Sequence, residues 1–264
     1  MASDGSVYVS DHNHRIQKFT AEGVFVSKWG TEGRWDRDTP LPGEFHYPWD
    51  VAVASDGSVY VVDNGYKRIQ KFTSEGVFVS QWGTPGTDDR QFGSPVGVAV
   101  APDGSVYVVD GGNNRIQKFT SEGVFVSKWG TQGTGDGEFL NPYRVAVQTD
   151  GSVYVSDFSN NRIQKFTAGG VFVTKWGSSG SGEGQLIDPR GVAVASDGSV
   201  YVADEGNQRI QKFTSGGVFV NKWGTQGSGD GEFNNPFGVA VASDGSIYVS
   251  ERNGHRIQKF TVGQ

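Results

Sequence analysis

The sequence predicts an all-β fold of six four-stranded antiparallel blades, the architecture of a β-propeller. The hexapeptide RIQKFT occurs six times, and after the first copy it returns every 47 residues, for example from Arg68 to Arg115. A period of this length is typical of propeller blades. The chain also has 40 glycines beside 17 phenylalanines, 9 tyrosines and 7 tryptophans, a composition typical of short strands joined by tight turns.

Each repeat is expected to form four short strands in an antiparallel meander. In one copy these strands are residues 191–195, 199–204, 209–214 and 218–224, with links short enough for hairpins. The first, second and fourth strands are apolar at consecutive positions (VAV, VYV, VFV). We expect such runs where neighbouring blades cover both faces of a sheet. The third strand carries Gln and Lys in every copy and is expected to be half exposed.

One tryptophan per repeat ends the fourth strand and is expected to fill the wide outer gap between blades. These residues are Trp29, Trp82, Trp129, Trp176 and Trp223.

The repeats predict a single domain over residues 1–264 whose first and last blades are incomplete. The second and third strands occur six times, but the first and fourth occur five times. Blade 1 should therefore lack its innermost strand and blade 6 its outermost, which leaves unpaired backbone at both places. The alternatives are an incomplete sixth position, completion by self-association with another chain, or a fragment of a longer protein.

Composition and charge argue against several partners. The net charge is −6, whereas binding to DNA or to anionic membranes needs an excess of positive charge. No apolar run approaches the roughly 20 residues of a membrane helix. The N-terminus has no signal-peptide pattern, and the chain has no cysteine. We expect no DNA or membrane partner and a cytoplasmic location, although the compartment is not fixed by the sequence.

The repeat resembles the NHL repeat. The pattern P-x-G-V-A-V, D-G-x-V-Y-V-x-D and N-N/H-R-I-Q-K-F runs through nearly the whole chain, and residues 13–16 read NHRI. The resemblance implies a six-bladed propeller that serves as a non-enzymatic scaffold for protein or peptide binding. The copies are so alike that recent amplification, or a designed repeat protein with no selected ligand, is a second interpretation.

Function is expected at the end of the blades where the connections vary. The links between the second and third strands, and those between repeats, differ from copy to copy, whereas the other turns are nearly constant. Aromatic and arginine side chains there supply contact area and planar charged donors. The candidate ligand-binding residues are Trp49, Asp50, Tyr66, Tyr143, Arg144, Phe158, Arg190, Phe237 and Arg252, with Arg34, Trp35 and Arg37 on the long first connection. The alternative is that Trp49, Tyr143 and Phe237 simply plug the channel.

Two other functions are weaker. Animal NHL domains bind single-stranded RNA on the equivalent face. In this chain acidic residues lie among the basic ones, so no continuous positively charged surface is expected. These acids are Asp50, Asp88, Asp89, Asp188 and Glu205. Similar propellers include metal-dependent lyases and lactonases. The inner strands of this chain have no acid or histidine inside VAV, and no catalytic motif is present. We therefore expect neither catalysis nor a cofactor.

Histidines and acids near the turns have both structural and metal-binding interpretations. His12, His14 and His255 could converge to hold zinc if blades 1 and 6 are neighbours, with His46 on the long connection. The favoured interpretation is that they are turn residues. An acid also ends each second strand and an arginine begins each third strand, which favours structural pairs over a ring of cation ligands. The acids are Asp11, Asp63, Asp110, Asp157, Asp204 and Glu251.

Overall fold

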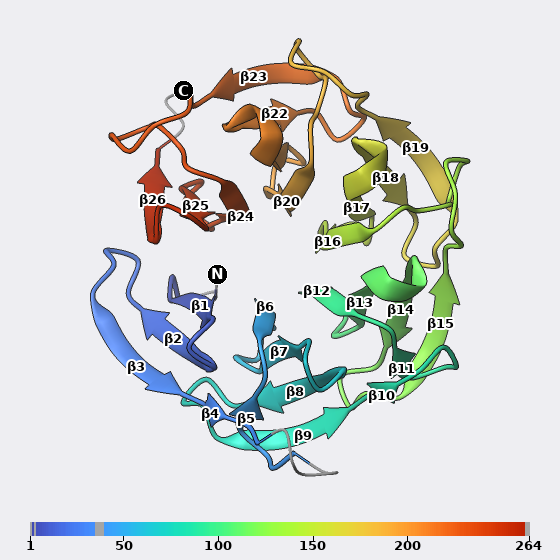
Figure 1. Ribbon diagram of the computed structural model, residues 1–264, viewed down its shortest axis with the longest axis vertical. Helices are drawn as coiled ribbons and strands as arrows, with labels where there is room; N and C mark the ends of the chain where they lie inside the picture. Colours follow the sequence, from blue (N-terminus) through green and yellow to red (C-terminus); the bar gives the residue numbers. More distant parts are fainter. Residues whose placement is uncertain (1, 3, 35–39, 262–264) are drawn as a thin grey trace. The chain divides into compact units, whose positions relative to one another are not determined.

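The computed structural model confirms an all-β chain with the fold class of a six-bladed β-propeller. It describes residues 2, 4–34 and 40–261. The chain divides into two compact units, Met1–Trp129 and Gly130–Gln264, each with three blades. Within a blade, successive strands pair antiparallel in chain order (Figure 1).

The first unit contains one three-stranded and two four-stranded blades. Blade 1 is β1 (Val7–Asp11), β2 (Arg15–Phe19) and β3 (Phe25–Trp29); blade 2 is β6 (Pro48–Val53), β7 (Val59–Asp63), β8 (Arg68–Phe72) and β9 (Phe78–Trp82); blade 3 is β12 (Pro95–Val100), β13 (Val106–Asp110), β14 (Arg115–Phe119) and β15 (Phe125–Trp129). Within the described residues, blade 1 lacks the innermost strand, as predicted.

The second unit contains two four-stranded blades and one three-stranded blade. Blade 4 is β16 (Pro142–Val147), β17 (Val153–Asp157), β18 (Arg162–Phe166) and β19 (Phe172–Trp176); blade 5 is β20 (Pro189–Val194), β21 (Val200–Asp204), β22 (Arg209–Phe213) and β23 (Phe219–Trp223); blade 6 is β24 (Pro236–Val241), β25 (Ile247–Glu251) and β26 (Arg256–Phe260). Blade 6 has no outermost strand in the part of the chain that the structure describes, which confirms the second prediction.

The connections between blades contain short parallel contacts and single turns of 3-10 helix. The parallel pairs are β4 (Thr31–Glu32) with β5 (Glu44–Phe45) and β10 (Thr84–Pro85) with β11 (Gln91–Phe92). In the second unit, single bridges such as Ser179 to Leu186 stand at the same place. The helical turns are η1 (Gly111–Asn113), η2 (Phe158–Asn160) and η3 (Glu205–Asn207), between the second and third strands.

The second strand of each four-stranded blade is buried along its whole length. In β21, all five residues of VYVAD are buried. One apolar cluster joins Val200 on one face of this strand to blade 4, and a second joins Tyr201 on the other face to Ile247 of blade 6, so adjacent blades cover both faces. The continuous apolar run therefore predicted two-sided burial correctly here.

Two other burial predictions are wrong. The fourth strand is not covered on both faces, because it forms the outer edge of the blade: Val218 and Val220 are 66% and 50% exposed. Only Phe219 between them turns inward, with its ring 6.3 Å from that of Phe213. The third strand is not half exposed either. Gln211 is fully buried, and its amide is satisfied there because it donates to Asp204 at 2.9 Å and to the Gln185 carbonyl at 2.6 Å.

The tryptophan that ends the fourth strand packs against the following blade, as predicted. The Trp176 ring lies 5.9 Å from that of Phe213 in the next blade. Gly217 has φ +88°, and a Cβ there would stand 2.5 Å from the Trp176 indole. This turn therefore needs glycine both for its backbone conformation and for the approach of the indole.

A buried acid–arginine pair holds the end of each four-stranded blade together. In blade 5, Arg209 Nε donates to Asp204 at 2.7 Å. The other guanidinium nitrogens donate to three backbone carbonyls between residues 181 and 185, at 2.7 to 2.9 Å. We call this arrangement the arginine latch. It fixes the variable connection against the blade and confirms the predicted pairing of the acids with arginine. The other latch pairs include Asp63–Arg68, Asp110–Arg115, Asp157–Arg162 and Glu251–Arg256.

Candidate binding site

The predicted site residues of the second unit lie where the inner strands begin with a β-bulge. In β16, Pro142 is opposite Asp157 and Val145 is opposite Val155, so two residues of β16 face one of β17. The same irregularity begins β20 and β24. A bulge bends its strand and redirects the side chains at that point. The residues that follow each proline, Tyr143-Arg144, Arg190 and Phe237, therefore sit at the ends of the strands.

A hydroxyl group fixes two of these bulges. Ser156 Oγ accepts a bond from the Arg144 amide at 2.9 Å and donates to the Arg190 carbonyl at 2.6 Å. Ser156 was not among the site residues predicted from the sequence. The available signal was a hydroxyl in the second strand, where blades 2 and 3 have valine.

Three aromatic rings surround the Arg190 guanidinium. Its central carbon lies 4.6 Å from the ring centres of Tyr143 and Phe158 and 5.1 Å from that of Phe237. The Tyr143 and Phe237 rings meet edge to face with centres 5.5 Å apart. Cation–π contacts of this kind hold a guanidinium in place while leaving part of its donor edge open.

Two further arginines share these rings. Arg144 is buried, 5.1 Å from the Tyr143 ring centre and 5.4 Å from that of Phe237. Arg252 is exposed and lies 5.9 Å from the Phe237 ring centre. We call the six residues Tyr143, Arg144, Phe158, Arg190, Phe237 and Arg252 the Arg190 cluster. The structure thus brings together all the predicted site residues of the second unit.

A carboxylate of blade 5 contacts this cluster. Glu205, at the start of η3, forms an ion pair with Arg190 and accepts a bond from the Asn235 amide at 3.2 Å. Arg190 is therefore held by a carboxylate as well as by the aromatic rings. Burial raises the pKa of the Tyr143 phenol, although Arg144, Arg190 and Arg252 act in the opposite direction. Glu205 was predicted to be an acid on this face, but its pairing with Arg190 was not predicted.

The predicted residues of the first unit contribute to packing and to backbone hydrogen bonds. Trp49 is partly buried against the core cluster of blades 2 and 3. Asp50 Oδ2 accepts a bond from the Val98 amide at 2.9 Å, and the Tyr66 hydroxyl donates to the Arg34 carbonyl at 3.2 Å. Trp35 and Arg37 lie outside the described residues.

Histidines of the first unit cluster around Tyr47. The rings of His14 and His46 stack 5.6 Å apart, and the Tyr47 ring lies 4.3 Å from that of His46. Burial lowers the pKa of His46, with the charge of His14 acting in the same direction. His12 contacts the Tyr47 ring edge to face at 6.0 Å.

The positions of His14 and His255 agree with the turn interpretation. Both have left-handed φ, 58° and 49°, like Asn161 and Gln208 at the same place in other repeats. Among residues 2, 4–34 and 40–261, no group of three or more His, Asp or Glu side chains is arranged to hold a metal ion.

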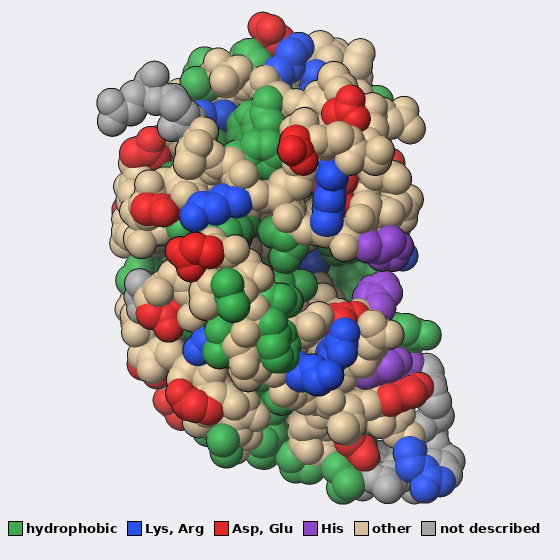
Figure 2. All heavy atoms as spheres, turned by 90° about the vertical axis from the view of Figure 1, so that its left-hand side faces the viewer, with side chains coloured by type: hydrophobic (Ala, Val, Ile, Leu, Met, Phe, Trp, Pro, Cys, Tyr) green, Lys and Arg blue, Asp and Glu red, His purple; other side chains and the backbone are tan. Residues whose placement is uncertain are grey.

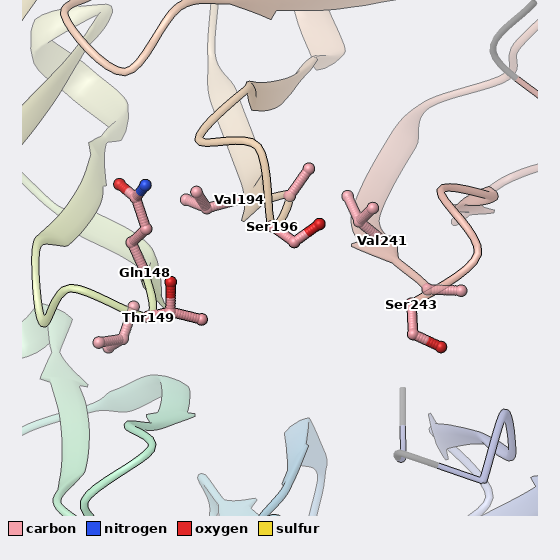
Figure 3. A pocket seen from close by; sticks show the side chains of 9 residues that line it. Gln148, Thr149, Val194, Ser196, Val241 and Ser243 are labelled. Atoms are coloured by element: carbon pink, nitrogen blue, oxygen red, sulfur yellow. The ribbon is translucent and has the colours of Figure 1, made fainter.

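A small pocket lies at the other end of the inner strands of the second unit (Figure 3). Its volume is about 160 Å³, and its wall comes from the turns after β16, β20 and β24. The lining residues are Val147, Gln148, Thr149, Val194, Ala195, Ser196, Val241, Ala242 and Ser243. None of these side chains titrates, so the pocket offers no acid or base.

The repeat sequence assigns the chain to a family. The NHL repeat pattern matches residues 45–72, 92–119, 139–166, 186–213 and 233–260. These segments cover more than half of the chain, which therefore belongs to the NHL repeat family.

Curated relatives match over a short stretch. Peptidyl-glycine alpha-amidating monooxygenase B of Xenopus laevis is 37% identical over 81 residues, which is 29% of this chain and 9% of that protein. The peptidylglycine alpha-amidating monooxygenase of Rattus norvegicus is 37% identical over 76 residues, 28% of this chain and 8% of that protein. The chain thus matches less than a tenth of these relatives.

Solved structures match over nearly the whole chain. A streptogramin B lyase has a TM-score of 0.68 and 17% identity, covering 98% of this chain and 76% of the other. A catalytically inactive virginiamycin B lyase from Staphylococcus aureus with quinupristin has a TM-score of 0.68 and 19% identity, covering 99% and 79%. Identities this low establish the shared fold alone. None of the helices in the described part of the chain has the length and apolar character needed to cross a membrane.

Proposed function

We propose that this chain is a non-enzymatic scaffold that binds a protein or peptide through the Arg190 cluster, with a carboxylate of the partner as the anchoring group. The observation that carries the proposal is the set of three guanidiniums held on three aromatic rings, of which that of Arg252 is exposed. Arginine and aromatic residues are enriched among the side chains that dominate binding energy at protein interfaces.

The geometry supports recognition because the cluster is ordered before a partner arrives. The Arg190 guanidinium is held by ring contacts and by Glu205, and the bulges are fixed by Ser156. A side chain that is already immobilised loses less entropy on binding. Arg252 is exposed and can pair with a carboxylate in the bidentate geometry that guanidinium favours.

The surface charge favours a peptide over RNA. Single-stranded RNA needs a continuous positive groove along its backbone. The chain carries a net charge of −6, and the face drawn in Figure 2 shows acidic and basic side chains interspersed. A single cluster with an exposed arginine, Arg252, matches a carboxylate better than a chain of phosphates.

The names of the relatives do not extend an activity to this chain. The monooxygenases act on peptidyl-glycine by name, but the match covers 8% to 9% of their length. In the Arg190 cluster, the Glu205 carboxylate is paired with an arginine, and the six cluster residues are three arginines, two phenylalanines and a tyrosine. These features support binding in preference to catalysis.

Peptide phage display against the wild-type protein tests the proposal. We expect the selected peptides to be enriched in Asp and Glu. They should bind at least ten times more weakly to Arg252→Glu, which reverses a charge at an exposed position of the cluster. Arg90→Glu is the matched control, because Arg90 is an exposed arginine of the first unit outside the cluster.

Three results would reject this function. They are no enrichment of acidic peptides, equal loss of binding in Arg90→Glu and Arg252→Glu, and tighter binding of a single-stranded RNA homopolymer with a steep dependence on salt. The last result would favour RNA as the ligand.

A further inference from the structure

The last strand of blade 6 presents an edge that every other blade covers. In the described residues β26 pairs with β25 alone, whereas the identical RIQKF strand β22 pairs with β21 on one side and β23 on the other. Ile257 is 39% exposed, while the equivalent Ile210 is fully buried. An edge strand with an exposed apolar side chain is a template for adding another strand.

The other blades of the same chain show which sequence pairs with an RIQKF strand at this edge. All six third strands read RIQKFT, and five of them are followed by a fourth strand of sequence V-F-V-S/T/N-K/Q-W. In blade 5 the register is Ile210 to Trp223, Gln211 to Lys222 and Lys212 to Asn221. Each of the five RIQKF strands that has such a neighbour keeps this register.

Blade 6 contains residues equivalent to those that a fourth strand contacts in blade 5. The Trp223 ring packs edge to face on Tyr201 with centres 6.2 Å apart. Tyr248 of blade 6 corresponds to Tyr201 and is likewise buried, and Lys259 lies over its ring as Lys212 lies over Tyr201. A tryptophan opposite Ile257 would therefore meet in Tyr248 the counterpart of the tyrosine that Trp223 contacts within its own blade.

We propose that the open edge of β26 is a docking site for an extended peptide segment of the fourth-strand sequence, Val-Phe-Val-x-Lys-Trp, added antiparallel as a fourth strand. Main-chain hydrogen bonds supply affinity in this mode, and alternate side chains supply specificity. A free segment is the occupant, because in a second copy the described fourth strands are already paired with third strands of their own.

Fluorescence anisotropy with a labelled peptide corresponding to residues 216–225 tests the proposal. The full 264-residue chain should bind it saturably. A peptide with alanine in place of the tryptophan should bind at least ten times more weakly, because it loses most of the apolar area that covers Ile257. A peptide with proline in place of Asn221 should lose binding as well, because proline cannot donate a backbone hydrogen bond and fits an extended ladder poorly.

Disulfide trapping then tests the position and register. The chain has no cysteine, so Lys259→Cys introduces a single thiol. A peptide with cysteine in place of Asn221 should cross-link to this variant, because directly opposite residues lie within disulfide range. The matched control is Lys212→Cys, the same position in blade 5, where β23 already occupies the edge.

The proposal is overturned by any of three outcomes. The first is the absence of saturable binding. The second is equal cross-linking of Lys259→Cys and Lys212→Cys, or equal cross-linking by a peptide with cysteine in place of Lys222. The third is a stable dimer, seen by light scattering, that excludes the peptide, which would make a second copy the occupant instead.

Discussion

Two strands of identical sequence, β22 and β26, differ in burial. Both read RIQKF and both pair in the same register with the second strand of their blade. Four of the five residues of β22 are buried, whereas in β26 every residue is at least partly accessible. The difference is the outer strand β23, which covers β22 and has no counterpart on β26 in the described chain. The local sequence therefore sets the register, and the neighbouring strand sets the burial.

The arginine latch does not depend on the outer strand. Arg256 donates to Glu251 at 2.6 Å and to three carbonyls of its connection at 2.7 to 3.0 Å, the same pattern as Arg209. What changes is the shielding of the pair: the Arg256 side chain is 29% exposed and that of Arg209 is 8% exposed. The two blades therefore hold the same interaction in different environments, which makes them a matched pair for experiment.

The largest expected effect is the loss of the latch where it is covered. Arg209→Ala leaves the Asp204 carboxylate buried without its arginine, and we expect a loss of about 4 kcal/mol in the free energy of unfolding. Arg256→Ala should lose about 1 to 2 kcal/mol, because water reaches the exposed site and replaces part of the interaction. Urea denaturation followed by tryptophan fluorescence measures both. Equal losses would show that β23 does not shield the latch.

A smaller effect is expected from the isoleucine of the same two strands. Ile210→Ala removes a fully buried side chain beneath Trp223 and should cost about 3 kcal/mol of unfolding free energy. Ile257→Ala removes a side chain that is 39% exposed, and its cost should stay below about 1 kcal/mol. The same denaturation experiment measures the pair, and a larger loss at Ile257 than at Ile210 would contradict the comparison.

The sequence predicted the blades well because the repeat specifies local structure. The glycine turns, the second strands and the acid–arginine pairs depend on residues a few positions apart, and each occurs where it was expected. The exposure of Val218 and Val220 was predicted wrongly, because apolar residues in a row do not reveal that the strand lies at an edge. The burial of Gln211 was also missed, because a polar residue is expected to be wet unless its buried partners are known.

The site was predicted as a set of positions but not as a network. The residues after each loop proline were correctly expected to gather at the ends of the inner strands of the second unit. The pairing of Arg190 with Glu205 and the bridge through Ser156 depend on bulges and on contacts between blades. Such contacts join residues far apart in the chain, and no local pattern encodes them.

The smallest expected effect is a dependence on pH in blade 6. Burial acts to raise the pKa of Glu251, but hydrogen bonds from Arg256, the Asn234 amide and Gln258 outweigh it and hold the pKa below its ordinary value of 4.5. The unfolded state therefore binds the proton more readily. The stabilisation by this carboxylate is present above the ordinary value and is lost as the pH falls through the folded pKa.

Glu251→Gln should remove this dependence. Wild type should be the more stable protein by a constant amount above about pH 5, and the difference should shrink below about pH 4. Urea denaturation of both proteins across this range measures it, with Asp230→Asn as a control for an exposed acid in the connection that precedes blade 6. A difference between wild type and Glu251→Gln that stays constant from about pH 3 to pH 7 would mean that water at the uncovered edge already cancels the effect of the latch on this carboxylate.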